Sequence, residues 1–276
     1  MDIVDFILNV AGLLLWLNWR SIRFDPLTRR MPSTLMGTLR PASPDRLRRW
    51  HFLVFIAGLL FLRALIYRWL GGATGTTTVY LDFGATAQGF RHDIFVQALA
   101  FSVFSFARAL GILYIALLFF SLLAGPPPIS GLIKIPLGRV SDWPGWLKAL
   151  LPFLATAIFW WLASWIFTTF PPQIATSPAQ KFQGALVMGL CSYLVWKIPA
   201  CGILTLYLLS SYVYFGRHPL WNYIQVTALK LLRPIKGLPL RIGRVDLAPL
   251  LEIAILFFLF AAAERGLVWL YAHRIS

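Results

Sequence analysis

Long apolar stretches alternate with short polar loops along the whole chain. A helix that crosses a bilayer needs about 20 predominantly apolar residues, and six stretches approach or exceed that length. They are residues 3–17, 50–70, 94–124, 147–170, 182–215 and 247–273. The pattern predicts an all-α, polytopic membrane protein with six transmembrane helices. The first stretch is short, so an alternative with five spans and an interfacial first segment stays open.

The fifth stretch, residues 182–215, is longer than a bilayer requires, and such a helix must tilt, kink or project beyond the membrane. Pro199 stands near its middle. Proline has no N–H to donate, and its ring clashes with the carbonyl group four residues earlier. We therefore expect a kink in the fifth span close to Pro199.

Composition also indicates a membrane protein. Hydrophobic residues make up 59% of the chain and charged residues 13%, and the mean hydropathy is +0.72. Soluble domains have roughly half apolar and a quarter charged residues. The N-terminus carries Asp2 and Asp5 where a signal peptide has basic residues, so we expect no secretory signal there.

The formal net charge is +15, and the basic residues gather in the loops after the first, third and fifth stretches. The only basic residues in the other two loops are Arg91 and Lys181. Cytoplasmic loops are enriched in Lys and Arg, so the three basic loops are predicted to be cytoplasmic and both termini to face outward. Basic loops beside membrane helices favour anionic lipid headgroups, and we expect no nucleic acid partner.

The spans pair into three similar units, each with a helix, a basic loop containing Pro and Gly, and a second helix. Each second helix follows a polar residue that can cap its first turn, with a proline close behind. The predicted caps are Ser43, Asp142 and Asp246. We therefore expect three αα-hairpin repeats, whereas each cap taken alone also fits an unrelated helix. The hairpins cover residues 1–70, 94–170 and 182–276, with outward loops at 71–93 and 171–181.

The third basic loop contains a predicted amphipathic helix at residues 219–232. Its apolar face carries Leu220, Trp221, Ile224, Ala228, Leu231 and Leu232. Its polar face carries Asn222, Gln225 and Arg233. Such a helix lies on the cytoplasmic membrane surface or packs under a partner subunit, and we favour the membrane surface. The residues predicted to contact lipid headgroups or a partner are Lys230, Arg233, Lys236, Arg241 and Arg244.

Residues 218–258 resemble the repeat of the YggT family of small bacterial and plastid membrane proteins. That repeat has an Asn-Pro near the loop start, then a threonine, a proline with basic residues, an Ile-Pro, and a Gly-x-Asp that leads into a span. The matching positions are Pro219, Thr227, Arg233, Lys236, Pro239, Gly243 and Asp246. His218 stands where the asparagine is expected, and Pro249 matches a frequent proline after the aspartate.

The other two units match the repeat less fully. The second keeps Pro136, Gly138 and Asp142, and the first keeps Asp25 and Pro26. Most family members resemble two such units, whereas this chain would have three. The resemblance implies a non-enzymatic, multi-pass protein of the bacterial cytoplasmic (inner) membrane. Members are linked to membrane-protein assembly, to cell-division or thylakoid organisation and to osmotic stress.

Five ionisable residues stand out inside the predicted spans, where charge is costly and commonly functional. They are Arg63, Arg108, Lys197, Glu252 and Glu264. One hypothesis pairs them across helices, for example Glu264 with Arg108 or Arg63, and so holds the bundle together. The other has the last four line a path for an ion. Pairing is favoured because the basic residues outnumber the acids, and Arg63 could also extend toward the outer interface.

Motifs for catalysis are absent from the sequence, which has no P-loop, no G-x-S-x-G and no H-E-x-x-H. Its four histidines are scattered, without the spacing of zinc or haem ligands. Cys191 and Cys201 would lie about 15 Å apart along a helix, too far for a disulfide between them. We therefore predict no catalytic residue, no cofactor and no metal.

Two further features concern packing. Three pairs of small residues at helical spacing, Ala107/Gly111, Ala185/Gly189 and Ala262/Gly266, predict close helix packing within or between subunits. The outward loop 71–90 is rich in Gly and Thr, with one strand-like piece at 77–83. This loop would dock on a neighbouring protein or act as a flexible tether.

The favoured function is a non-enzymatic membrane scaffold, assembly factor or subunit of a larger membrane complex. Its expected partners are anionic lipid headgroups and either another membrane protein or further copies of the chain. The alternative is a transporter or channel built on the charged residues inside the spans, namely Arg108, Lys197, Glu252 and Glu264.

Overall fold

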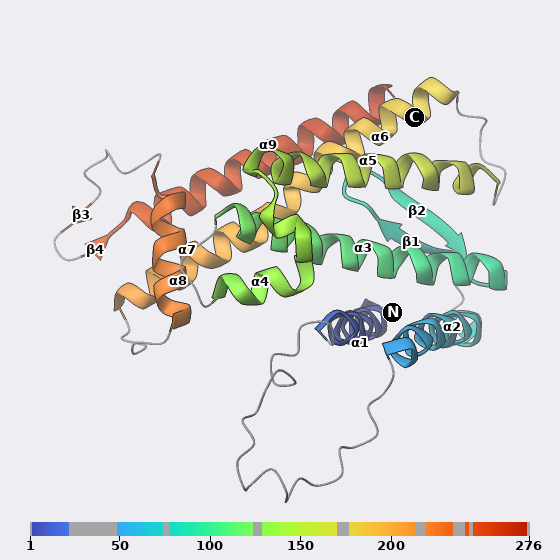
Figure 1. Cartoon of the computed structure of the whole chain (residues 1–276). Coiled ribbons are helices and arrows are strands. Elements are labelled where there is room, and N and C mark those ends of the chain that lie inside the picture. The colour runs from blue at the N-terminus through green and yellow to red at the C-terminus, as the bar shows by residue number, and fades with distance from the viewer. Residues whose placement is uncertain are drawn as a thin grey trace, which may run out of the picture. The chain divides into compact units, whose positions relative to one another are not determined.

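The computed structural model describes residues 2–21, 49–73, 78–123, 129–169, 177–212, 219–233, 241–242 and 245–274. Within these ranges, six helical segments are long and apolar enough to cross a membrane. They are α1 (Asp2–Ser21), α2 (Arg49–Ala73), α3 (Phe95–Leu122), α5 (Gly145–Thr169), a broken segment from α6 to α7, and α9 (Ala248–Arg274) (Figure 1). The prediction of a predominantly helical membrane protein with six spans is confirmed. The first segment is long enough to span, and its mean hydropathy of 1.3 is the lowest of the six.

A 3₁₀ segment interrupts the fifth span. This segment, η5 (Ser192–Trp196), separates α6 (Pro178–Cys191) from α7 (Lys197–Tyr212). Pro199 lies in the first turn of α7 and has no N–H for the carbonyl of Val195, four residues earlier. The sequence predicted a kink close to Pro199; the structure has a 3₁₀ segment there, which ends three residues before the proline.

The chain forms two compact units. Unit 1 comprises Met1–Leu81 and Gly89–Leu110, and unit 2 comprises Asp82–Gln88 and Gly111–Ser276. The division falls within α3, so the compact units do not coincide with the three predicted hairpins. The hairpin repeat itself stays a prediction.

Close helix approaches hold unit 1 together. α1 packs along α2 (Figure 1), and Gly12 of α1 faces the ring of Phe106 of α3. A Cβ atom at Gly12 would lie 2.7 Å from Cε2 of that ring. Ser102 of α3 donates a 2.9 Å hydrogen bond to the carbonyl of Leu60 in α2. Small and hydroxyl side chains thus let these helices approach closely, as is common in membranes.

The loop between α2 and α3 forms a β-hairpin of β1 (Thr78–Asp82) and β2 (Ala87–Arg91). The sequence predicted only the first strand. Asp82 accepts a 2.7 Å hydrogen bond from the Gly84 N–H, and Gly84 has a φ of 95°. Glycine adopts this left-handed conformation without steric cost, so it suits the turn.

In unit 2, α5 packs most extensively against α6 (Figure 1). A Cβ atom at Gly189 would lie 3.0 Å from the backbone oxygen of Phe153, and Ala185 is buried one turn earlier. The pair Ala185/Gly189 therefore marks a close helix contact within the chain. At Gly111 and Gly266, from the other two small-residue pairs, a Cβ atom would meet nothing within 4 Å.

The main core of unit 2 lies where α7 meets α8 (Pro219–Leu231) and α9. Its buried members are Phe119, Ala200, Ile203, Leu204, Ile224, Ala228 and Leu232. The apolar face of α8 therefore packs on α3 and α7 of its own chain. This corrects the predicted placement of the helix on the membrane surface, because neighbouring spans provide the apolar partner that lipid was expected to supply.

The loop before α5 is also helical, with α4 (Ile129–Leu137) followed by the 3₁₀ segment η4 (Gly138–Asp142). The Asp142 carboxylate is exposed and lies 3.5 Å from Lys134 Nζ. α5 begins only at Gly145. Asp142 therefore does not cap α5, contrary to the prediction, because two further residues separate it from the first turn.

A short antiparallel ladder, β3 (Arg241–Ile242) with β4 (Val245–Asp246), precedes α9. The carbonyl of Leu247 accepts the first helical bond, from the Leu251 N–H at 3.1 Å. The side chain of Asp246 and the whole of Ser43 fall outside the described part of the chain, so these two caps stay predictions.

Candidate functional site

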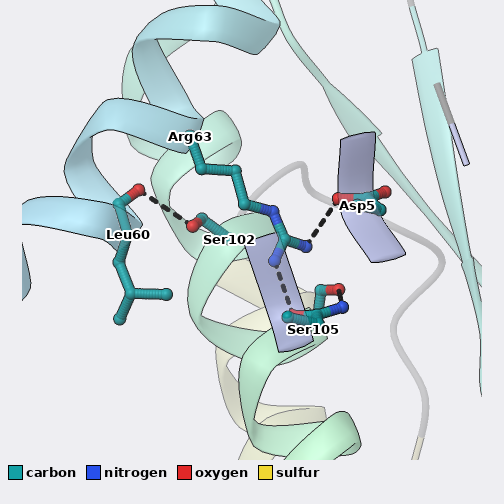
Figure 2. A network of polar contacts seen from close by, with 6 residues as sticks. Asp5, Leu60, Arg63, Ser102 and Ser105 are labelled. Carbon is teal, nitrogen blue, oxygen red and sulfur yellow. Dashed lines mark hydrogen bonds and ion pairs between the residues drawn. The ribbon is translucent and has the colours of Figure 1, made fainter. Parts of the chain in front are cut away.

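Unit 1 contains a buried polar network centred on Arg63 of α2 (Figure 2). Arg63 Nη2 lies 2.8 Å from Asp5 Oδ1 of α1, an ion pair that lacks hydrogen-bond geometry. Arg63 Nη1 donates a 2.8 Å hydrogen bond to Asn9 Oδ1, and Asn9 Nδ2 donates to Ser105 Oγ of α3 at 3.1 Å. Three helices thus meet around one guanidinium group.

Helical spacing explains how α1 reaches this site. Asp5 and Asn9 are four residues apart, so both side chains lie on one face of α1. The Arg63 side chain is 0% exposed, and its guanidinium carbon lies 5.4 Å from the centre of the Phe101 ring. The predicted extension of Arg63 toward the outer interface is therefore corrected. Its charge pairs inside the bundle of unit 1, with Asp5.

The network lies deep in the apolar zone. Counted along the helix at about 1.5 Å per residue, Arg63 is ~5 Å from the middle of the span Trp50–Trp69. By the same count Asn9 is ~4 Å from the middle of Ile3–Arg20. The hydrocarbon core extends about 15 Å to either side of its midplane. An unpaired charge at this depth would be expensive, so Asp5 and Asn9 stabilise the buried Arg63.

A second pair of ionisable residues lies at a similar depth in unit 2, on α9. Glu264 and Arg265 are ~5 Å and ~7 Å from the middle of the span Ala248–His273. Both side chains are exposed, and neither forms an ion pair within the described part of unit 2. Successive residues on a helix point about 100° apart, so the two cannot face each other.

Glu264 and Arg265 border an open groove on the surface of α9. The groove is lined by Ala261, Glu264, Arg265, Val268 and Trp269, all from this one helix. The Trp269 ring stacks on His273 one turn further on, with ring centres 4.7 Å apart. This face therefore combines apolar side chains, from the small Ala261 to the large Trp269, with two opposite charges near the middle of a span.

The other predicted intramembrane residues have different surroundings. Arg108 of α3 is half-buried in unit 1. Lys197 Nζ lies 4.2 Å from the centre of the Phe257 ring, a cation–π contact. Glu252 is 7% exposed near the start of α9, where the helix dipole favours an acid. Within the described part of unit 2, no ion pair or hydrogen bond joins Lys197, Glu252 and Glu264.

The predicted headgroup contacts have varied positions. Lys230 Nζ donates a 3.2 Å hydrogen bond to the carbonyl of Leu123, just past the end of α3, where a cation is favourable. The Lys230 side chain is exposed, so its predicted contact with a lipid headgroup or a partner stays a prediction. Arg233 is exposed. Lys236, Arg244 and the side chain of Arg241 fall outside the described part of the chain.

α8 also contributes two buried polar side chains, although Lys230 itself is exposed. Thr227, one of the positions of the YggT resemblance, is fully buried. The Tyr223 hydroxyl lies 3.5 Å from the carbonyl of Phe120, and burial raises the pKa of Tyr223. These contacts fix α8 against the end of α3.

Sequence patterns did not single out Asp5 and Asn9 as partners of Arg63. The available signal was an acid and an amide four residues apart in an otherwise apolar segment. A second missed signal is Ser177 with Gln180, which form a capping box at the start of α6. Among the described residues, His, Cys, Asp and Glu nowhere gather in threes to hold a metal.

Comparisons with protein-family models, with curated proteins and with solved structures give no match. The class that the fold defines is a multi-pass integral membrane protein.

Proposed function

We propose that this protein is a non-enzymatic scaffold, assembly factor or subunit of a larger membrane complex. One observation carries the proposal: Glu264 and Arg265 are exposed near the middle of α9. A charged side chain at the centre of a membrane helix costs about 2.5–3.5 kcal/mol on insertion scales. A partner helix that supplies complementary groups would remove much of this cost.

The resemblance to the YggT family supports the same proposal. It involves the segment that leads into α9, from His218 to Asp246, and the family is linked to membrane-protein assembly. The transporter alternative requires Arg108, Lys197, Glu252 and Glu264 to act along one path. No ion pair or hydrogen bond among the described residues of unit 2 joins its three members of that set, so assembly is the function that we propose.

The proposal is tested by purifying the tagged full chain from native membranes in a mild detergent and measuring the mass of the particle by light scattering. We expect a mass well above that of one chain. The variant Glu264→Gln/Arg265→Gln should lose the associated material. Arg68→Gln is the matched control, because Arg68 is also an exposed basic residue of a span but lies at its end. A wild-type particle that contains one chain alone would contradict the proposal.

We further infer a bacterial inner-membrane location with the basic loops in the cytoplasm and both termini outward. The positive-inside rule supports this orientation. Single cysteines placed by Met36→Cys and Thr76→Cys, in a background without Cys191 and Cys201, report on the two sides. A membrane-impermeant thiol reagent added to intact cells should label residue 76 and not residue 36. Labelling of residue 36 would reverse the orientation.

A further inference from the structure

The groove on α9 has a self-complementary arrangement of charge. Ala261 and Val268 are seven residues apart and lie nearly in line along the helix. Glu264 and Arg265 point to opposite sides of that line, about 50° away from it at 3.6 residues per turn. The two charges therefore flank a central stripe of small and medium apolar side chains.

Two copies of one chain that insert in the same orientation are related by an axis along the membrane normal. A two-fold axis of this kind makes the same patch meet itself. It brings the Glu264 side of one helix opposite the Arg265 side of the other, and the reverse contact follows by symmetry. The two residues differ in depth by only ~1.5 Å, so both reciprocal pairs lie at one level of the bilayer.

We propose that the Ala261–Val268 face of α9 is a homodimer interface, in which Glu264 of each copy pairs with Arg265 of the other. This inference rests on the proposed function, because it names the partner as a second copy of this chain. The small Ala261 side chain at the centre lets the two backbones approach closely. Both charges are neutralised without a second protein, and lipid is excluded from them.

Charge reversal gives a test that a different partner protein cannot imitate. The variant Glu264→Arg carries two adjacent positive charges, and Arg265→Glu carries two adjacent negative charges. Each variant should fail to pair with itself, whereas the two variants should pair with each other. With two different affinity tags, we expect each variant to co-purify the other and not a second copy of itself.

The neutral variant Glu264→Gln measures how much the charge pair contributes to dimerisation. Removing one member of a buried charge pair should weaken dimerisation about thirtyfold or more. The double reversal Glu264→Arg/Arg265→Glu should dimerise about as strongly as the wild type, because the reciprocal pairs form again with their signs exchanged. In a complex with a different protein, the double reversal would place like charges opposite both charges of the partner, and the association would be lost.

Cysteine crosslinking tests the face without changing any charge. In a Cys191→Ala/Cys201→Ala background, Ala261→Cys places a thiol at the centre of the interface, where a disulfide between two copies can form. Ala263→Cys is the matched control, because it has the same residue type at nearly the same depth but lies on the opposite side of α9. We expect an oxidised dimer for residue 261 only.

The outcomes separate this inference from the proposed function. If the wild-type chain is found in a larger particle but two differently tagged copies never co-purify, the dimer is wrong and the complex-subunit proposal survives. Equal crosslinking at residues 261 and 263 would likewise overturn the dimer face. A wild-type chain that is monomeric in native membranes would overturn both.

Discussion

Two pairs of opposite charges lie at similar depths in the spans, and the chain treats them differently. In unit 1, Arg63 is fully buried and meets Asp5 at 2.8 Å. On α9, Glu264 and Arg265 are both exposed and have no ion-pair partner within the described part of their unit. The hydrocarbon penalty on a charge is the same in kind for both pairs. The first pair is neutralised within the chain, whereas the second would be neutralised by a partner under our proposal.

The helix contacts around the two pairs differ in the same direction. Gly12 lies against the Phe106 ring of unit 1, with no room for a Cβ atom. At Gly266, one residue after Arg265, a Cβ atom would meet nothing within 4 Å. A close helix approach therefore accompanies the satisfied charge, and open space accompanies the unsatisfied ones. Position within a span does not by itself tell whether a charge is structural, because its partner decides that.

The largest effect is expected from Arg63→Leu. This change leaves Asp5 without its counter-charge and removes the donor to Asn9. Breaking a buried ion pair by removing one partner costs about 3–5 kcal/mol. The free energy of unfolding in detergent micelles, measured by denaturant titration, should fall by that amount.

The control for Arg63→Leu is the double variant Arg63→Leu/Asp5→Leu. Replacing both members of a buried pair with apolar side chains is often neutral, so stability should return toward that of the wild type. If the double variant is as unstable as the single one, the cost comes from packing around Phe101 and the account of the charge pair is wrong.

Gly12→Ala should have the second-largest effect. The new methyl group would lie 2.7 Å from the Phe106 ring, so α1 or the ring must move. Overpacking of this kind costs about 1–3 kcal/mol. Thermal unfolding in micelles measures the loss. The matched control is Gly266→Ala, which meets nothing and should cause no loss; equal effects at both glycines would remove the contrast between the two regions.

Much of the fold was accessible from the sequence because span length and apolar content report directly on the bilayer. The six spans follow from a local rule, since about twenty apolar residues can cross a bilayer wherever they occur. The 3₁₀ segment near Pro199 is also local, since proline has no N–H to donate. The pair Ala185/Gly189 was likewise interpretable, because small side chains at helical spacing permit close packing. The turn chemistry of Asp82 and Gly84 was equally local, although only one of the two strands was predicted.

The candidate site was less accessible because its contacts join residues distant in the sequence. Asp5 and Arg63 are brought together only by the packing of α1 on α2, which periodicity alone does not specify. The amphipathic pattern of α8 identified an apolar face but not what covers it; the structure places α3 and α7 there. The exposure of Glu264 and Arg265 could not be predicted from the sequence either, because a charged residue in a span can face either the bundle or the lipid.

A smaller effect on stability is expected from Glu264→Gln/Arg265→Gln. Neither side chain has an ion-pair partner within the described part of unit 2, so the unfolding free energy of the dissociated chain should change by less than about 0.5 kcal/mol. Association should be lost, as light scattering reports. A large loss of stability in the single chain would mean that these charges have internal partners, and the contrast with Arg63 would fail.

The smallest effect concerns a third pair, formed by the exposed side chains of Arg91, at the end of β2, and Asp93, shortly before α3. The hydrogen bond from Arg91, with Nη2 2.7 Å from Asp93 Oδ2, lowers the pKa of Asp93. A carboxyl group whose folded pKa is depressed contributes stability above its unfolded pKa of about 3.9 and loses that contribution as the pH falls through the folded value. Wild type should therefore exceed Asp93→Asn in thermal stability at neutral pH, and the two should converge in acid.

Salt separates this exposed pair from the two pairs inside the membrane. The side chains of Arg91 and Asp93 are about half exposed, so mobile ions screen their attraction. The difference between wild type and Asp93→Asn should shrink at about 1 M salt, where the Debye length is about 3 Å. The loss caused by Arg63→Leu should be unchanged by the same salt, because ions do not enter a bundle where Arg63 is fully buried. If the loss caused by Arg63→Leu depends on salt, water reaches the network, and the account of Arg63 as a charge neutralised away from water would be wrong.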